Sequence, residues 1–173
     1  MEFTKVLQMR RSTRTYRPEQ ISEEQLAAVL AAAQSSPIAM GRFDRVRLVV
    51  VQDADMLESL NADFAAATDL KDAYPTYGAP TVIFVLEKKE DADTLSGANA
   101  ACIVEHMALA ATDLGLGSVY LLGICRELQH SAHTAALLHI PSDFRLVSAV
   151  AVGYPAEPLT EREPKEHFEV RRL

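Results

Sequence analysis

The residues with the clearest chemical potential lie in one short run, MRRSTRTY, at Met9–Tyr16. The run holds three arginines, two threonines and a serine, in a chain whose formal net charge is −7. A guanidinium is a planar fork of donors that matches a phosphate group, and nearby hydroxyls add further donors. Arg10 and Arg14 are four residues apart, so on a helix end or a tight turn they would grip one anion from the same side. Taken alone, the run fits a solvated basic turn better than a site for a phosphorylated ligand, because charged runs on surfaces are common.

Other reactive side chains form weaker patterns. Cys102 and His106 share a face of a predicted helix, where a thiol and an imidazole could act as nucleophile and base, but no third group orients them. A buried cysteine beside a hydrogen-bonded histidine fits better. His130 and His133 would also share a face that could bind a metal, yet no carboxylate or cysteine at ligand spacing completes such a site. Glycine-rich phosphate loops, nucleophile elbows and HExxH are absent from the sequence, so it assigns no catalytic side chain and no metal ligand.

Length and composition limit the class of protein. A chain of 173 residues, 49% of them apolar, predicts one domain over residues 1–173 or a small subunit of a dimer. The acidic balance argues against binding to nucleic acid or to an anionic membrane surface. No apolar run approaches the roughly 20 residues of a membrane span, and the N-terminal residues do not resemble a signal peptide. Two cysteines without a paired spacing suggest a reducing compartment, so we expect a cytoplasmic protein.

The periodicity of apolar residues predicts a sheet covered by helices on both faces. Ser22–Gln25 reads as a capping box that starts a helix, and Gly115 as the glycine that ends the longest one. Four nearly continuous apolar runs read as buried strands. The expected elements are helices over 3–9, 22–34, 56–67, 96–114 and 128–138, strands over 45–52, 80–86, 119–122 and 144–152, loops over 35–41 and 68–77, a turn opened by Gly123, and a tail without periodicity over 156–173.

The ordered set of these pieces resembles the nitroreductase family of flavin-mononucleotide (FMN)-dependent oxidoreductases. Each segment is weak evidence alone, but together they span essentially the whole chain in order. The matching segments are Arg10–Tyr16, Ser36–Arg42, Arg47–Val51, Gly78–Val85, Ala108–Gly123 and Pro141–Pro155, with Arg162 as a late basic residue.

This resemblance implies an α+β fold: a three-layer α-β-α domain with a central mixed, mainly antiparallel sheet. It implies a homodimer with FMN between the subunits and a C-terminal extension, residues 156–173, that packs on the partner. The arginine run and Arg162 would hold the flavin phosphate, and two apolar segments would enclose the ring. The implied cofactor-binding residues are Arg10, Arg11, Ser12, Thr13, Arg14, Pro37, Ile38, Met40, Gly41, Leu121, Leu122, Gly123 and Arg162.

The sequence departs from the family pattern near the expected flavin ring. Gly41 stands where the family usually carries asparagine, and Phe43-Asp44-Arg45 replaces a glutamine–proline–tryptophan run. Glu105-His106 stands where many members have glutamine–asparagine. The chain is also short for the family, so we expect no helical lid. These departures bear on substrate and activity more than on fold.

Two functions are consistent with these residues. The first is an oxidoreductase in which FMN takes a hydride from NADH or NADPH and passes electrons to a nitroaromatic, quinone or similar acceptor by a ping-pong mechanism. No acid–base side chain is then required, because the cofactor carries the chemistry. The second is a non-catalytic dimer that binds flavin or another phosphorylated ligand as a sensor or carrier. A ligand-free acidic scaffold is a third, less specific possibility.

Overall fold

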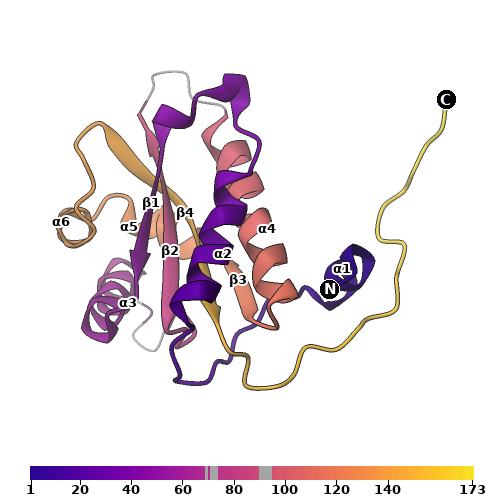
Figure 1. The fold of residues 1–173 in the computed structure, drawn as a ribbon. Coiled ribbons are helices and arrows are strands. Elements are labelled where there is room, and N and C mark those ends of the chain that lie inside the picture. The colour runs from indigo at the N-terminus through magenta and orange to yellow at the C-terminus, as the bar shows by residue number, and fades with distance from the viewer. Residues whose placement is uncertain (69, 71–73, 90–94) are drawn as a thin grey trace.

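A four-stranded sheet between two layers of helices forms the body of the protein (Figure 1). The computed structural model describes residues 1–68, 70, 74–89 and 95–173. The strands are β1 (Val46–Val51), β2 (Thr81–Lys88), β3 (Gly117–Leu121) and β4 (Phe144–Gly153), and the helices are α1 (Phe3–Met9), α2 (Glu23–Gln34), α3 (Ala54–Thr68), α4 (Ser96–Asp113), α5 (Leu122–Leu128) and α6 (Ala132–Leu137). The strand order is β1-β2-β4-β3, and all three ladders are antiparallel.

The two faces of the sheet carry separate hydrophobic cores, because alternate residues of a strand point to opposite faces. On β2, Val82 and Phe84 pack with α3 and α5, whereas Ile83 and Val85 pack with α2 and α4. All four side chains are fully buried. The continuous apolar run predicted from sequence is therefore explained by burial on both faces, and the predicted α-β-α layering is confirmed.

Local sequence signals set most helix boundaries. The Ser22 hydroxyl accepts a hydrogen bond from the Gln25 amide while the Gln25 side chain accepts one from the Ser22 amide, which is the predicted capping box. The Asp53 carboxylate accepts a hydrogen bond from Met56 N at the start of α3. Gly115 has φ +74° directly after α4, a left-handed conformation that costs glycine little.

The predicted turn at Gly123 and the predicted single helix over 128–138 are wrong. Gly123 lies inside α5, which begins at Leu122 with no loop after β3. A break at 129–131 then separates α5 from α6. The Ser131 hydroxyl accepts a hydrogen bond from Thr134 N and so begins a new helix there. The sequence analysis missed this N-cap because the apolar period runs across it.

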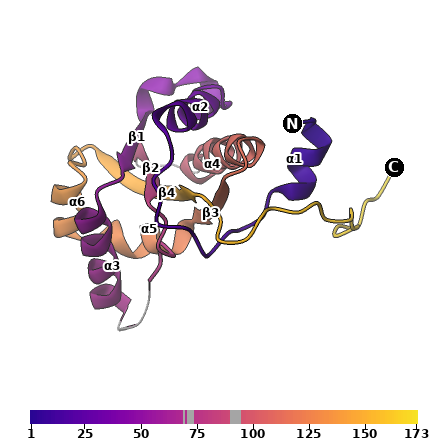
Figure 2. The ribbon, with the colours of Figure 1, turned by 60° about the horizontal axis from the view of Figure 1, so that its bottom comes forward.

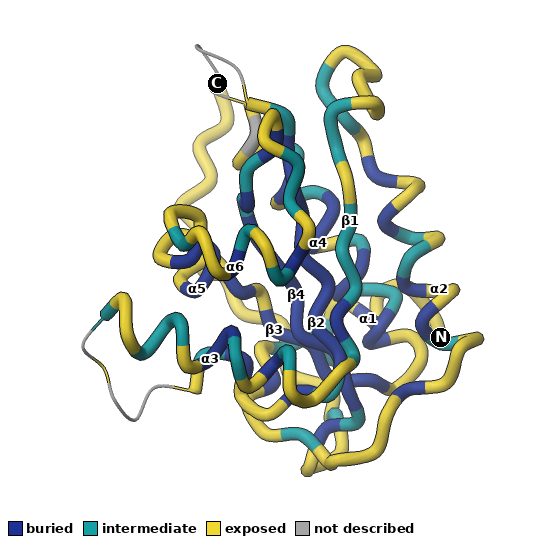
Figure 3. Tube along the Cα trace, turned by 90° about the vertical axis from the view of Figure 1, so that its left-hand side faces the viewer, coloured by how far each residue is buried: buried dark blue, intermediate teal, exposed yellow. Residues whose placement is uncertain are grey.

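Two segments extend away from the body. In Figures 1 and 2, α1 lies outside the helical layers, beside the extended chain that follows β4 and ends at the C-terminus. Val6 of α1 is buried, but Phe3 and Leu7 are exposed. The tail carries Phe168 and Val170 at 85% and 78% exposure, and Figure 3 shows this segment exposed along most of its length. Among the described helices, none has the length and apolarity to cross a membrane.

The carboxylate of Asp63 joins α3 to the start of α6. Its Oδ2 accepts hydrogen bonds from Thr134 Oγ1 at 2.7 Å and Ser131 Oγ at 3.0 Å, and His133 Nδ1 lies at 2.9 Å. Burial by itself raises the pKa of Asp63, but the hydrogen bonds from Thr134, His133 and Ser131 outweigh it and hold that pKa below its usual value. The ionised carboxylate is therefore the form that the fold stabilises.

We expect Asp63→Asn to lower the free energy of unfolding at neutral pH by about 1–3 kcal/mol, because the buried Thr134 hydroxyl loses its charged acceptor. A carboxyl whose pKa is lowered in the folded state stabilises the fold above its unfolded pKa, and this contribution is lost as the pH falls through the folded pKa. The difference in the free energy of unfolding between variant and wild type should thus be largest at pH 7 and shrink below about pH 4. Urea unfolding at several pH values measures it. Asp44→Asn is the control, and an equal loss at pH 3 would contradict the assignment.

Candidate functional site

The arginine run lies in an extended segment against the end of the sheet. The segment follows α1, and Ser12 forms a parallel bridge with Ser118 of β3 while Tyr16 bridges Pro155 after β4. Thr13 N donates to Ser118 O at 2.9 Å, and Arg17 N donates to Tyr154 O at 2.9 Å. Backbone hydrogen bonds to two strands therefore fix the segment over residues 12–17.

Two glycines make room for this segment. Gly117 and Gly153 are direct partners across the β3–β4 ladder. A Cβ on Gly117 would meet the Thr13 side chain at 2.7 Å, and one on Gly153 would meet Pro80 Cδ at 2.7 Å and Tyr16 Cδ1 at 3.0 Å. Because real Cβ contacts essentially never fall below 3.0 Å, Gly117 must be glycine for the segment to lie this close, and Gly153 must be glycine for Pro80 to lie where it does.

Two side chains of the segment face away from the sheet. Thr13 is buried toward the sheet, whereas Ser12 and Arg14 are exposed. Arg10, the residue that caps the end of α1, is half-buried. Arg10 and Arg14 do not share a helix face or a tight turn, because α1 ends at Met9 as predicted and the chain after it is extended. At ~3.3 Å per residue their Cα atoms are about 13 Å apart, so an anion held by both would lie between them, near Ser12.

Neighbouring side chains set the electrostatics of this cluster. Arg10 Nε lies 3.6 Å from Glu105 Oε1 on α4, and the Arg14 guanidinium carbon lies 5.8 Å from the centre of the Tyr77 ring. The Tyr16 hydroxyl donates to Thr13 O at 2.9 Å. Burial raises the pKa of Tyr16 far above its ordinary value although Arg14 opposes the shift, so this hydroxyl stays protonated as a donor. The sequence analysis left Glu105 open between a carboxylate facing the site and a charge on the helix surface. It missed Tyr77 beside Arg14, since no spacing rule joins the two residues.

Arg11 and Arg162 join the tail to the N-terminal segment. Arg11 Nη2 donates to the carbonyl and the hydroxyl of Thr160, and Arg162 donates to Gln8 O at 3.2 Å through Nε and to Arg10 O through Nη2. The donors of Arg162 thus contact the main chain that carries Arg10. This geometry gives both residues a structural role, whereas the sequence analysis expected them at a phosphate.

The other predicted residues lie in two separate places. Ala39 N, in the loop that carries Pro37, donates to Asn99 Oδ1 in the first turn of α4. The arginine segment instead contacts β3, which follows the opposite end of that helix. Leu121 is buried in the core, while Leu122 and Gly123 are exposed at the start of α5. Within the described chain, the Pro37–Gly41 loop therefore does not meet the arginine segment.

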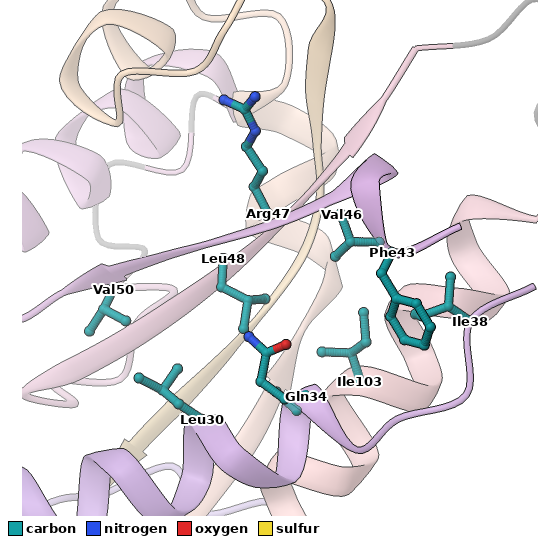
Figure 4. Close-up of a pocket in the computed structure, with 10 residues that line it drawn as sticks. Leu30, Gln34, Ile38, Phe43, Val46, Arg47, Leu48, Val50 and Ile103 are labelled. Carbon is teal, nitrogen blue, oxygen red and sulfur yellow. The ribbon is translucent and has the colours of Figure 1, made fainter. Parts of the chain in front are cut away.

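The side chain of Ile38 belongs to a different hollow. Figure 4 shows a groove between α2 and β1 in which Ile38 lies beside Phe43. Its volume is about 470 Å³, and Leu30, Leu48 and Ile103 supply apolar walls. The guanidinium of Arg47 points away from it and stacks on Phe144, at 4.3 Å from the ring centre. Next to the groove, Met40 is 78% exposed and has a left-handed backbone with φ +56°.

The remaining candidates from the sequence have ordinary partners. His106 Nδ1 lies 2.9 Å from the carbonyl oxygen of Cys102 in the preceding turn of α4, so this histidine is hydrogen-bonded as expected. Cys102 is half-buried rather than buried. His133 lies against Asp63. Among the described residues, no group of three or more histidine, cysteine or acidic side chains is placed to hold a metal ion.

These features define a class of protein: a three-layer α-β-α domain whose N-terminal segment presents arginines at the edge of an antiparallel sheet. The chain belongs to the nitroreductase family, whose model matches residues 7–154. A protein of Archaeoglobus fulgidus, provisionally named an NADH dehydrogenase/NAD(P)H nitroreductase, is 31% identical over 99% of this chain and 96% of its own.

Solved structures share the fold. A nitroreductase from Bacteroides fragilis with bound FMN has a TM-score of 0.85 and 26% identity, covering 100% of this chain and 99% of that one. A nitroreductase from Desulfitobacterium hafniense, also with bound FMN, has a TM-score of 0.86 at 21% identity, with the same coverage. The family and the fold expected from the sequence are therefore confirmed.

We expect Gly117→Ala to destabilise the protein by about 1–3 kcal/mol, because the new methyl group overlaps the Thr13 side chain. The melting temperature and the free energy of unfolding measure the effect. Thr13→Gly in the same chain removes the atoms that the methyl group meets, so the double variant should recover part of the loss. Gly123→Ala is the control, since a Cβ there meets nothing within 4 Å. Equal stability of Gly117→Ala and wild type would show that the segment does not need this close approach.

Proposed function

We propose that this protein is an FMN-dependent oxidoreductase that uses NADH or NADPH to reduce nitroaromatics, quinones or similar acceptors. The observation that carries the proposal is the placement of Ser12 and Arg14 on the exposed side of one fixed segment, with Arg10 just before it. Two guanidinium groups and a hydroxyl match the roughly two negative charges and the acceptor oxygens of a terminal phosphate. The FMN named for the B. fragilis structure supports the same ligand here.

The residues of this chain bind and orient the flavin, and the flavin, when bound, supplies the two-electron chemistry. Arg10 and Arg14 neutralise the phosphate, and the Ser12 hydroxyl donates to it. The exposed backbone at Leu122–Gly123 lies in the first turn of α5, where amides lack an intrahelical acceptor. We assign these amides to the polar edge of the flavin ring, where donated hydrogen bonds tune its electronics.

We further propose that the site is completed in a homodimer. The Pro37–Gly41 loop is anchored to the first turn of α4 and the arginine segment to β3, and they do not meet in the described chain, so a slot lined by both requires the loop of a second copy. The chain also exposes 10193 Å² of surface, whereas a compact chain of 19.0 kDa is expected to expose about 8,400 Å². The excess and the exposed Phe3, Leu7, Phe168 and Val170 support a partner that covers α1 and the tail.

A second function is favoured by two observations. Glu105 competes with a phosphate for Arg10, and Gly41 offers no side chain to a flavin ring. Weak binding without rapid turnover would suit a sensor or carrier of flavin. Anaerobic mixing with NADH or NADPH separates the two functions: loss of the oxidised flavin's visible absorption within seconds supports the enzyme, and flavin that stays oxidised supports the carrier.

We expect Arg14→Ala and Arg10→Ala each to cost about 1.5–3 kcal/mol of FMN binding, because a charge-assisted hydrogen bond to phosphate is lost. This corresponds to a Kd raised roughly ten- to a hundredfold. Quenching of flavin fluorescence measures Kd. Riboflavin, which lacks the phosphate, should bind all variants equally. Arg17→Ala, on the same segment but outside the cluster, is the matched control. Unchanged FMN affinity in both arginine variants would refute the phosphate site.

The dimer has its own test. We expect the double variant Phe168→Asp with Val170→Asp to shift the protein toward a monomer in sedimentation experiments, because two apolar side chains per subunit would be charged at the interface. Each such side chain contributes about 1.5–3 kcal/mol when buried. Leu70→Asp, an exposed apolar residue after α3, is the control. A double variant that stays dimeric would show that the tail does not pack on the partner.

A further inference from the structure

The turn between α3 and β2 holds Tyr77 in an unusual conformation. Tyr77 has φ +56° and is followed by Gly78 at φ +69°, so two consecutive residues are left-handed. A bulky side chain rarely adopts this region, because its Cβ crowds the backbone. Such a conformation persists only where the surroundings determine it, and it often marks a functional position.

A buried side chain from another element determines this turn. Asn61 of α3 is 3% exposed, and its Oδ1 accepts hydrogen bonds from Thr76 Oγ1 at 3.0 Å and Thr76 N at 3.3 Å. Thr76 itself is 1% exposed. Tyr77 N donates to Tyr74 O at 2.9 Å, and Ala79 N donates to Thr76 O at 3.1 Å. The backbone on both sides of Tyr77 is therefore fixed.

The fixed turn delivers an aromatic ring to the arginine cluster. The ring centre of Tyr77 lies 5.8 Å from the Arg14 guanidinium carbon, within the range of a cation–π contact. Within the described chain, the Tyr77 hydroxyl donates to no acceptor and Arg14 has no carboxylate partner. The contact between Arg14 and Tyr77 is therefore made through the face of the tyrosine ring.

We propose that Tyr77 is a positioning residue that holds the Arg14 guanidinium ready for the phosphate of the flavin. An exposed arginine loses side-chain freedom when it binds, and a stacked ring removes part of that cost beforehand. A ring also leaves every N–H donor available, whereas a carboxylate would occupy the donors that the phosphate needs. Arg10, beside Glu105, lacks this advantage. The inference rests on the proposed phosphate site.

The experiment compares FMN with riboflavin in two variants of Tyr77. Tyr77→Asn removes the ring, and asparagine tolerates a left-handed backbone, so the fold should be kept. Tyr77→Phe keeps the ring and removes the hydroxyl. We expect Tyr77→Asn to raise the Kd for FMN about three- to tenfold, Tyr77→Phe to leave it unchanged, and riboflavin to bind all forms equally. Tyr74→Asn, on the same turn with its hydroxyl on Glu58, is the matched control.

A double-variant cycle tests the coupling directly. If Tyr77 acts through Arg14, Tyr77→Asn should have no further effect on FMN binding once Arg14 is alanine. The inference is overturned if Tyr77→Asn leaves the FMN Kd unchanged, weakens riboflavin equally, or still weakens FMN in the Arg14→Ala protein. An equal loss in Tyr77→Phe would also overturn it, since the hydroxyl would then matter. Failure of the wild type to prefer FMN over riboflavin would instead refute the phosphate site. Melting temperatures of all variants separate these outcomes from misfolding.

Discussion

The close approach of the N-terminal segment to the end of the sheet is the constraint on which the functional part of the molecule depends. Gly117 and Gly153 face each other across the β3–β4 ladder, and together they leave space for Thr13 and Tyr16. Backbone hydrogen bonds to Ser118 and Tyr154 then hold the segment in place. Thr13 is buried against the sheet, and its two neighbours, Ser12 and Arg14, are exposed. The exposure of these two side chains is thus a consequence of how one extended segment packs.

The arginines around this segment have different roles. Arg10 and Arg14 remain directed outward, one beside a carboxylate and the other beside an aromatic ring. Arg11 and Arg162 instead donate to backbone acceptors and join the tail to the segment. Four arginines can lie close together here because each one contacts a carboxylate, an aromatic ring, a hydroxyl or backbone carbonyls, and these contacts offset the repulsion between the positive charges. The arrangement also links the N-terminal segment that carries the arginines to the tail.

Two of the departures from the family pattern, Gly41 and Phe43–Arg45, lie in or beside the groove that Ile38 lines, whereas Glu105 lies beside Arg10. Gly41, the exposed Met40 and the groove beside Ile38 and Phe43 form a surface with few polar side chains. An apolar surface of this kind suits flat, apolar acceptors, in agreement with the quinones and nitroaromatics proposed. Residues 10–14, by contrast, keep the arginines and the serine that the family resemblance implies.

The sequence by itself determined the layers of the fold, because continuous apolar strands must be buried on both faces. It also determined where α2 begins, because the hydrogen bonds of the Ser22–Gln25 capping box form within one turn. It also predicted a cluster of arginines at residues 10–14, although Arg11 and Arg162 contact the tail and the main chain. It did not determine their geometry: residues 10–16 are extended rather than turned, since the hydrogen bonds that fix them come from Ser118 and Tyr154. The start of α6 was missed because the bonds from Ser131 and Thr134 to Asp63 depend on a contact between distant helices. Only the tertiary structure brought Glu105 to Arg10 and Tyr77 to Arg14, because these neighbours are far apart in the chain and meet only when the sheet and helices pack together.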